Sequence, residues 1–463
     1  MKHVHLIGIG GTGLSAIARV LLESGYVVSG SDRELSALAQ QLTLAGAQVF
    51  IGHKAENIAG ADIVVRSSAV ADENVEVRAA RDKRIPVLKR AEFLGKILEN
   101  KRVIAIAGSH GKTTTSAMIA WILTALDQDP SFILGGVLKN LGTNARAGKG
   151  QSFVIEADEY DRMFLGLQPD IAVVTNVEHD HPDCFPSPEE FHQAFMDFAQ
   201  QLLPDGILLV CGDDSGARAL VSDVPNRSRS ILYGLDSSGI EHLDYVAHDL
   251  YLAKNGSYRY TAICAGERLA EVALQVPGKH NVQNSLAALT VAQVLSLPVE
   301  QAAAALGEYQ GAGRRFEVRG EAGGVIVIDD YAHHPTEIRA TIAAARERYP
   351  ARQLWVVWQP HTYSRTMLLF DQFAGAFEKA DHVLVTEVYA AREPAPPDFS
   401  AQNVVKAMRH PDANFASDFE QATDFLSAHL KPEAVLLVLS AGDADKISAK
   451  VLAARSESEE DYA

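Results

Sequence analysis

Cysteine is scarce in this sequence. Only three cysteines, Cys184, Cys211 and Cys264, occur among 463 residues, and none forms a CxxC pair. An odd number of cysteines without paired spacing excludes a disulfide framework and a cysteine-rich zinc module. The composition therefore fits a reducing compartment, and we expect a cytoplasmic location.

Long apolar runs are also missing. No run approaches the ~20 residues that are needed to span a bilayer. The first residues, MKHVHLIGIGG, lack a charged segment followed by an apolar stretch and a cleavage site, so we interpret them as a buried strand rather than a signal peptide. We expect no membrane partner.

Positive charge is in deficit. The chain has 42 Lys and Arg against 59 Asp and Glu, a formal net charge of -17, and no basic block stands out. A general binder of nucleic acid or of anionic membranes needs the opposite bias, so we expect no nucleic-acid partner. Any anionic ligand must be held by local sites rather than by the overall field.

The sequence does contain a regular alternation of short β-branched runs with amphipathic segments of helical length. This alternation predicts an α/β fold of βαβ units with largely parallel sheets. The length indicates several domains, and we place breaks near residue 99 and at GAGRR, 311–315. The predicted domains are a Rossmann-like N-terminal domain (1–98), a central P-loop ATPase-like domain (99–312), in which 236–276 form antiparallel strands, and a C-terminal Rossmann-like domain (313–463).

A phosphate-binding loop is predicted at GSHGKTTTS, 108–116, because this segment follows the strand-like run RVIAIA and opens a helix. In such a loop the backbone N–H groups face the anion, a lysine reaches the terminal phosphates and a threonine hydroxyl binds Mg²⁺. A strict Walker A motif would have glycine where Ile106 stands, so the loop is a compact GxxGKT variant. ATP rather than a dinucleotide is the expected cofactor, bound by Gly108, Ser109, His110, Gly111, Lys112, Thr113 and Thr114.

A second glycine-rich loop, GIGGTG, has the G-x-G-x-x-G spacing at Gly8, Gly10 and Gly13, and Asp32 ends the next strand. This spacing is typical of dinucleotide binding. Because an ATP loop follows in the same chain, we favour a nucleotide-diphosphate substrate here over NAD. The alternative is that the glycines serve only tight packing between strand and helix.

Two acidic loops follow strands of the central domain. They are EADEYD, 156–161, and NVEHDHPD, 176–183, and they place Glu156 and His181 at strand ends where these residues could hold Mg²⁺ directly or through water. A solvated turn is the alternative interpretation of each loop. In the third domain DDYAHHP, QPHTYSR, TEVYAARE and SAGDADK also follow apolar runs, so these four loops are expected to share one rim.

Taken together, these segments resemble the Mur ligases, the ATP-dependent amide-forming enzymes of peptidoglycan precursor synthesis. The resemblance covers essentially the whole chain in order, from GIGGTGLSAIA and VVRSSAV through AGSHGKTTTS, EADE, NVEHDH, PGKHNVQN and GAGRRFE to DDYAHHPTEI and QPHTYSRT. It implies that the lactyl carboxylate of UDP-N-acetylmuramate is phosphorylated by ATP and then joined to an amine. L-alanine is the expected acceptor, and a recycled tripeptide is the alternative.

The resemblance also implies roles for individual residues. Lys112, His110, Glu156 and His181 would carry the catalytic chemistry, with Thr113, Glu156 and His181 around Mg²⁺. His334 and Arg365 would hold the amino acid. ATP would further contact His280, Asn281, Asn284, Arg315 and Asp330, and the UDP substrate would contact Gly10, Gly11, Thr12, Gly13, Ser15, Asp32, Ser67 and Ser68.

Three positions depart from the pattern of the family. Thr362 stands where many members have a second arginine, which leaves Arg365 as the guanidinium of that motif. Pro182 replaces an apolar residue beside His181. Phe195 and its neighbours offer no lysine where sister ligases carry a carbamylated one, so we predict that none is used.

Two other classes of function compete with this interpretation. A nicotinamide-dependent dehydrogenase would explain the loop from Gly8 to Asp32 but not GKTTTS. A nucleotide switch would explain the phosphate loop but not the amino-acid motifs. The sequence leaves the oligomeric state open between monomer and homodimer.

Overall fold

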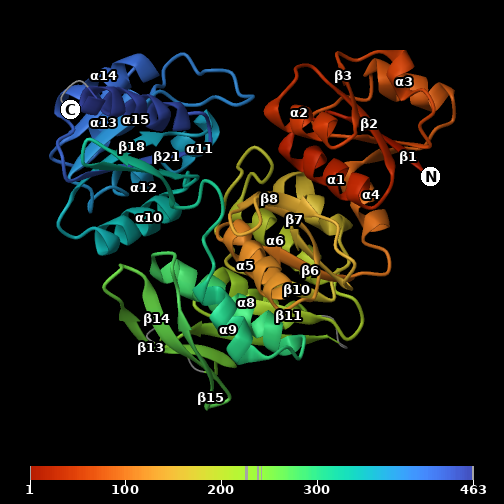
Figure 1. Cartoon of the computed structure of the whole chain (residues 1–463), viewed down its shortest axis with the longest axis horizontal. Helices are drawn as coiled ribbons and strands as arrows, with labels where there is room; N and C mark the ends of the chain where they lie inside the picture. Colours follow the sequence, from red (N-terminus) through yellow and green to blue (C-terminus); the bar gives the residue numbers. More distant parts are fainter. Residues whose placement is uncertain (1, 225–227, 237–238, 241, 461–463) are drawn as a thin grey trace.

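The computed structural model describes residues 2–224, 228–236, 239–240 and 242–460, which form three β-sheets flanked by helices (Figure 1). Strands of each sheet come from only one of the three predicted domain ranges. The predicted α/β fold of three domains is confirmed, while the domain boundaries stay predictions. Within the described residues, every helix is too short or too polar to cross a bilayer.

The N-terminal sheet is parallel and has the strand order β3-β2-β1-β4-β5. The central strand β1 is buried over Val4–Ile7, so the loop that follows it opens at the middle of the sheet edge. The elements are β1 (His3–Ile7), α1 (Thr12–Glu23), β2 (Val27–Asp32), α2 (Ala37–Leu44), β3 (Gln48–Ile51), η1 (Ala55–Ile58), β4 (Ile63–Arg66), α3 (Val75–Asp82), β5 (Val87–Lys89) and α4 (Arg90–Ile97).

The central sheet has the order β15-β14-β13-β12-β11-β10-β6-β9-β7-β8. Its core is parallel, and β13 to β15 pair antiparallel, as predicted for this part of 236–276. The strands are β6 (Arg102–Ala107), β7 (Ser131–Leu138), β8 (Thr143–Arg146), β9 (Ser152–Glu156), β10 (Ile171–Val174), β11 (Ile207–Cys211), β12 (Arg229–Leu235), β13 (Tyr245–Leu252), β14 (Tyr258–Cys264) and β15 (Glu267–Ala273). The helices are α5 (Lys112–Ala125), η2 (Tyr160–Gly166), α6 (Pro188–Ala199), α7 (Ser215–Ala219), η3 (Leu220–Asp223), α8 (Lys279–Val294) and α9 (Val299–Gly307).

Side chains of β6 alternate between the two faces of the central sheet, because successive residues of a strand point to opposite sides. Ile104 and Ile106 join a core with α5, α8 and α9. Val103 and Ala105 join a second core with α6, which also includes residues of α1 from the N-terminal domain. Helices α1 and α4 thus dock the N-terminal domain against β7, β8 and η2.

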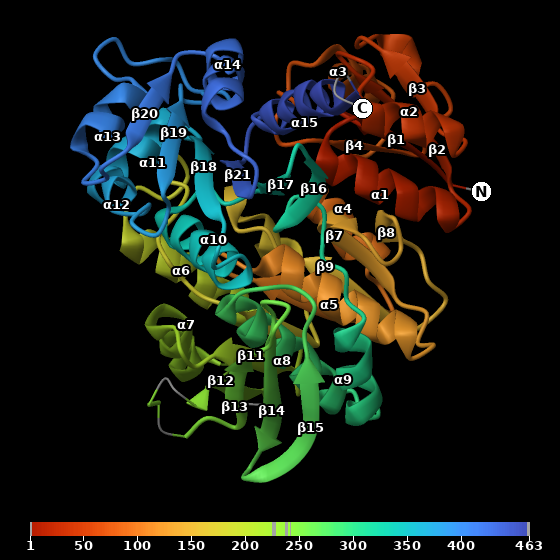
Figure 2. The ribbon, with the colours of Figure 1, turned by 60° about the vertical axis from the view of Figure 1, so that its left-hand side comes forward.

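The C-terminal sheet has the order β16-β17-β21-β18-β19-β20, with only β16 antiparallel to its neighbour among the described strands. Figure 2 shows α10 between this sheet and the central domain, where it contacts α8. The elements are β16 (Glu317–Ala322), β17 (Val325–Asp330), α10 (Pro335–Arg348), β18 (Gln353–Gln359), α11 (Tyr363–Leu368), α12 (Phe370–Ala374), β19 (His382–Thr386), α13 (Ala401–Ala407), β20 (Ala413–Ala416), α14 (Phe419–His429), β21 (Ala434–Ser440) and α15 (Asp445–Glu460).

Candidate functional site

The predicted phosphate loop connects β6 to α5. Gly111 precedes the helix with a φ of 81°, in the left-handed region, and a Cβ atom there would lie 2.7 Å from Oδ1 of Asn284. Gly108 also has a positive φ, 139°, and a Cβ atom on it would collide with the hydroxyl of Thr175. Glycine is therefore required at both positions, and the loop leaves the N-terminus of α5 open toward a ligand.

The ammonium of Lys112 lies inside the loop. Its Nζ donates to the carbonyl oxygen of Gly108 at 2.5 Å and to Oε1 of Glu159 at 2.8 Å. Burial disfavours the charged ammonium, but the negative charges of Glu159 and Glu156 outweigh burial and raise the pKa of Lys112. Glu159 was missed by sequence reasoning, although it is the last residue of the EADE motif.

Glu156, at the end of β9, faces Thr113 at the start of α5. The Thr113 hydroxyl donates to the Glu156 carboxylate at 3.0 Å, and the N–H of Gly135 donates to it at 2.7 Å. Burial raises the pKa of Glu156, although the charges of Lys112 and Arg315 oppose the shift. A Cβ atom on Gly135 would approach Oε2 of Glu156 to 2.5 Å, so this glycine makes room for the carboxylate.

The donors at this place fit a magnesium ion. Mg²⁺ prefers carboxylate and hydroxyl oxygens, which Glu156 and Thr113 supply side by side. Oε2 of Glu159, three residues further along the same loop, is buried without a hydrogen-bond partner. His181 is the remaining predicted ligand, and its Nε2 lies 3.6 Å from Oε1 of Glu159.

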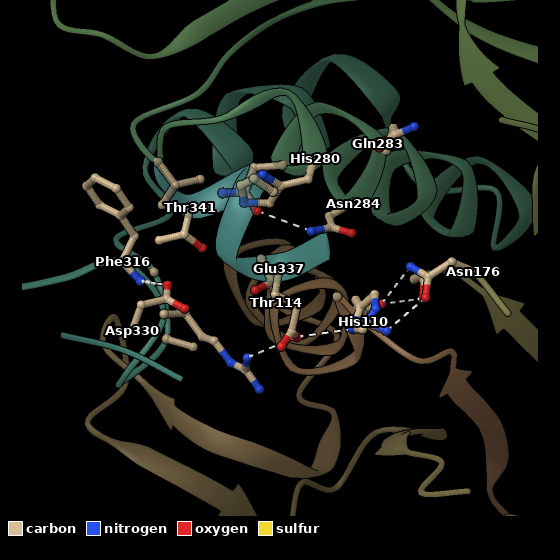
Figure 3. A pocket seen from close by; sticks show the side chains of 18 of the residues that line it. His110, Thr114, Asn176, His280, Gln283, Asn284, Phe316, Asp330, Glu337 and Thr341 are labelled. Carbon is tan, nitrogen blue, oxygen red and sulfur yellow. Dashed lines mark hydrogen bonds and ion pairs between the residues drawn. The ribbon is translucent and has the colours of Figure 1, made fainter. Parts of the chain in front are cut away.

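A cavity of about 1020 Å³ lies between the central and C-terminal domains, next to the phosphate loop (Figure 3). The structure brings into its lining most of the residues that were predicted to bind ATP. These are His110, Gly111, Thr114, His280, Asn281, Asn284, Arg315 and Asp330.

Hydrogen bonds orient the polar residues of this cavity. The side-chain amide of Asn284 donates to Oδ1 of Asn281 at 3.1 Å, and that of Asn281 donates to the backbone carbonyl of Pro277 at 2.7 Å. Asp330 accepts from the N–H groups of Phe316 and Ala332, each at 2.7 Å, and so shapes the segment that enters the third domain. Burial raises the pKa of Asp330 to about 6 despite the nearby charge of Arg315.

A second cavity, of about 610 Å³, lies between the N-terminal and central domains. Glu156 lines it, and Arg315 lines the first cavity. Both residues contact the Thr113 hydroxyl, to which Nη2 of Arg315 donates at 3.3 Å. The buried Thr113 side chain therefore connects a lining residue of one cavity to a lining residue of the other. The second is lined by Thr12, Gly13, Ala16, Ile17, Arg90, Leu94, Ile133, Leu134, Gly135, Ile155, Glu156, Asp158 and Met163.

The N-terminal glycine-rich loop ends at this second cavity. The Asp32 carboxylate accepts from the N–H groups of Gly10 at 2.8 Å and Arg33 at 2.7 Å, so it holds this loop in place. Ser15 donates to the carbonyl of Thr12 at 3.1 Å. The other residues predicted for the UDP site lie on the loops after β1 and β4; they are Gly11, Ser67 and Ser68. The backbone N–H of Ser67 donates to the carbonyl oxygen of Ile7.

On the side of the third domain, Arg365 is buried against the central domain. Its Nε donates to Oδ1 of Asp180 at 2.6 Å, while Nη1 lies 3.1 Å from Nδ1 of His361 and Nη2 lies 3.4 Å from Nδ1 of His181. Burial disfavours the Asp180 carboxylate, but the charge of Arg365 outweighs burial and holds its pKa well below the usual range. Asp180, within NVEHDH, was not singled out from the sequence.

His110 connects the phosphate loop to the start of α10. Its Nε2 lies 3.0 Å from Glu178 and its Nδ1 lies 3.3 Å from Glu337. Burial opposes protonation, yet these two carboxylates raise the pKa of His110 to about 10. His334 caps α10 and its ring lies 4.7 Å from that of His110. Burial, reinforced by the charge of His110, lowers the pKa of His334 to about 4.

The four loops of the third domain do share one rim, as predicted. The ring of His361 stacks on Tyr389 at 5.6 Å, which joins the loops after β18 and β19. Gln359 Oε1 accepts from Ser440 at 2.6 Å, which joins the last residues of β18 and β21. The rings of His333 and His361 lie 5.9 Å apart, which brings the loops after β17 and β18 together. Thr362 has a φ of 65° and directly precedes α11. Phe195 is fully buried and packs at 5.3 Å against Phe164.

Comparison with known proteins supports one family along the chain. Three family models match in succession: "Mur ligase family, catalytic domain" over residues 3–102, "Mur ligase middle domain" over 106–292 and "Mur ligase, glutamate ligase domain" over 314–442. The chain is 42% identical to the UDP-N-acetylmuramate--L-alanine ligase of Roseiflexus castenholzii, over 99% of this chain and 98% of that protein. It is also 42% identical to the ligase of the same name from Nitratidesulfovibrio vulgaris, over 98% and 99%.

Solved structures support the same family. The UDP-N-acetylmuramate-alanine ligase of Thermotoga maritima superposes with a TM-score of 0.82 and 28% identity, covering 99% of this chain and 100% of that one. A murein peptide ligase of Psychrobacter arcticus superposes with a TM-score of 0.73 and 26% identity, covering 98% and 99%.

Proposed function

Because the chain belongs to the Mur ligase family, we propose that it joins L-alanine to the lactyl carboxylate of UDP-N-acetylmuramate with conversion of ATP to ADP and phosphate. The observation that carries this proposal is that Thr113 of the phosphate loop contacts Glu156, which lines one cavity, and Arg315, which lines the other, so the loop lies between a nucleotide site and a UDP-substrate site. The full-length relatives at about 42% identity favour L-alanine over a tripeptide.

In the first step an oxygen of the lactyl carboxylate attacks the γ-phosphorus of ATP. The bond between the γ-phosphorus and the β–γ bridging oxygen breaks, and ADP departs. The substrate then carries an acyl phosphate. The protein has little covalent work here, so positioning and charge compensation carry the catalysis. Lys112 and the N–H groups from Gly108 to Thr114 would hold the phosphates, and protonated His110 would face the developing negative charge.

A magnesium ion would be held by Thr113, Glu156 and His181, with Glu159 close by. When bound, it would neutralise charge on the phosphoryl oxygens. The oxygen-rich, buried donor set described above supports this assignment.

The nucleotide base and sugar would lie in the first cavity against His280, Asn281 and Asn284, with Arg315 and Asp330 at the entry to the third domain. The UDP substrate would lie along the second cavity. Its binding residues would be Gly10, Gly11, Thr12, Gly13, Ser15, Ser67 and Ser68, with Asp32 holding the loop in place.

In the second step the alanine nitrogen attacks the acyl carbon. The new C–N bond forms, the C–O bond to phosphate breaks, and the leaving phosphate takes up the proton that the amine loses. Arg365 and His334 would hold the amino acid, Arg365 through its two terminal nitrogens, since Nε is committed to Asp180. The contacts of His110 with Glu337 and of Arg365 with Asp180 connect the third domain to the central domain, and closure there would exclude water from the reactive acyl phosphate.

We propose a cytoplasmic enzyme that acts as a monomer or homodimer, without nucleic-acid or membrane partners. The low cysteine content supports the compartment, and the net charge of -17 supports the lack of nucleic-acid and anionic-membrane partners.

The reaction can be tested by mass spectrometry of the product. Incubation with ATP, Mg²⁺, UDP-N-acetylmuramate and L-alanine should yield UDP-N-acetylmuramoyl-L-alanine, and omission of any one substrate should abolish it. Reduction with borohydride in the absence of L-alanine should convert the acyl phosphate to an alcohol. Product formation without ATP would contradict the mechanism, and a redox change with NAD instead would favour a dehydrogenase.

A further inference from the structure

Arg90 is the only positively charged side chain that lines the second cavity within the described part of the chain. The other charged residues in its lining are Glu156 and Asp158, both acidic. The proposed substrate carries a diphosphate and a carboxylate, and the chain as a whole has a net charge of -17. An anionic ligand in this cavity therefore depends on Arg90 for charge compensation by a side chain.

The guanidinium of Arg90 lies directly on the glycine-rich loop. A Cβ atom on Gly13 would collide with Nη1 of Arg90, and it would lie 3.4 Å from Cδ of the same side chain. The third glycine of the G-x-G-x-x-G spacing thus makes room for an arginine from α4. Nη1 is placed beside the open first turn of α1, which has no acidic residue and no side-chain cap.

The other terminal nitrogen of Arg90 contacts the central domain. Nη2 donates to Oδ2 of Asp158 at 3.2 Å. Asp158 lies between Glu156 and Glu159, which contact Thr113 and Lys112 respectively. One guanidinium therefore touches both the loop of the N-terminal domain and the acidic loop beside the phosphate site.

We propose, on the basis of the proposed function, that Arg90 binds the diphosphate of the UDP substrate through Nη1 while Nη2 stays on Asp158. The planar fork of arginine suits this double task, because its nitrogens point in fixed, different directions. Binding of the substrate would then be linked through Asp158 to the loop that carries Glu156. Arg90 is a binding residue in this account, and it takes no part in bond making.

The experiment measures the affinity of the full-length protein for UDP-N-acetylmuramate, UDP and UMP by isothermal titration calorimetry. Arg90→Gln should weaken the binding of UDP-N-acetylmuramate and of UDP at least tenfold, as expected for loss of a charge-assisted hydrogen bond. The affinity for UMP should fall less than threefold, because UMP lacks the second phosphate. The preference of the protein for UDP over UMP should therefore shrink about as much as the affinity for UDP.

Lys89→Gln is the matched control. Lys89 is the preceding residue, it is exposed, and it does not line the cavity. Its substitution removes the same charge and should leave all three affinities within twofold of the parent. If Lys89→Gln weakens UDP as much as Arg90→Gln does, the effect is long-range electrostatics and the proposal is wrong.

Other outcomes separate the inference from the function. If Arg90→Gln lowers only the melting temperature, and leaves the preference for UDP over UMP unchanged, Arg90 is a structural partner of Asp158 and the proposal is overturned. If the affinity for UDP-N-acetylmuramate falls but the affinity for UDP does not, Arg90 contacts the sugar or its carboxylate, and the diphosphate assignment is overturned. A parent protein that binds UDP but forms no product contradicts the proposed function alone, and one that binds neither UDP compound contradicts both.

Discussion

Nε of Arg365 lies 2.6 Å from Oδ1 of Asp180, although the two residues are 185 positions apart and belong to different domains. Both side chains are 3% exposed. A buried pair of this kind is costly to break from one side, because the remaining charge is left uncompensated. The pair therefore fixes which edge of the guanidinium can receive an amino-acid carboxylate, namely Nη1 and Nη2.

The first prediction concerns this guanidinium. Arg365→Lys should raise the KM for L-alanine at least tenfold, because an ammonium cannot keep the contact with Asp180 and also offer a two-point fork. The KM values for ATP and UDP-N-acetylmuramate should change less than threefold. Steady-state phosphate release with each substrate varied in turn checks this, and an equal rise in all three values would assign Arg365 to domain closure alone.

A second prediction concerns Lys112. Lys112→Ala should lower kcat by about 10²–10³-fold, the cost of one charge-stabilising group, ~2.7–4 kcal/mol. Because Lys112 neutralises buried Glu159, the variant should also melt at a lower temperature. Adding Glu159→Gln should restore much of the melting temperature without restoring phosphate release. Recovery of activity in the double variant would show that Lys112 acts only as a partner of Glu159.

A third prediction concerns the metal. Glu156→Gln keeps the shape of the side chain but removes its charge, so a higher Mg²⁺ concentration should be needed for half-maximal activity. ATP binding measured without Mg²⁺ should change little. Direct Mn²⁺ binding, measured by electron paramagnetic resonance in the presence of ADP, should weaken in parallel. If the metal titrations of variant and parent coincide, Glu156 serves only to hold Thr113 and Gly135.

A fourth prediction concerns pH and the N-terminal domain. Glu76 is fully buried and accepts hydrogen bonds from Ser31 and Asn57, each at 2.5 Å. Burial opposes its ionisation, but the contact with His5 and these hydrogen bonds outweigh burial and lower its pKa from 4.5 to about 2. A depressed pKa stabilises the folded state above the unfolded pKa, and this contribution is lost as the pH falls from 4.5 toward 2.

Glu76→Gln should accordingly lower the free energy of unfolding of this domain by about 1–3 kcal/mol at pH 7, since each pKa unit corresponds to about 1.4 kcal/mol. The difference from the parent should shrink steadily below pH 4.5. Urea unfolding at a series of pH values measures it. A difference that does not depend on pH would mean that packing, not charge, accounts for the effect.

Local patterns in the sequence predicted much of this molecule. Apolar runs followed by Gly-rich or polar loops located β6, the loop around Lys112 and the rim that carries His334, because a parallel sheet gathers such loops at one edge. Pairings across the chain could not be read in this way. The contacts of Arg365 with Asp180 and of Arg90 with Asp158 depend on how separate domains dock, and neither leaves a periodic signal.

The sequence also left some contacts of residues within the recognised motifs unpredicted. Glu178 and Glu337 lie in NVEHDH and HHPTEI, yet nothing in their spacing indicated that both would contact His110. Asp32 ends β2 as the spacing predicts, but its carboxylate holds the backbone of Gly10. An acidic residue at a strand end can serve a ligand, the loop itself or both, and its spacing in the sequence does not reveal the contact with the loop.

The most direct test of the account compares acceptors. Phosphate release should be measured with ATP, Mg²⁺ and UDP-N-acetylmuramate against L-alanine, glycine, L-serine and L-alanyl-γ-D-glutamyl-meso-diaminopimelate. The account predicts the highest kcat/KM for L-alanine, with glycine lower by about 10–200-fold, since one methyl group is worth ~1–3 kcal/mol in an apolar pocket. A higher kcat/KM for the tripeptide than for L-alanine would contradict it.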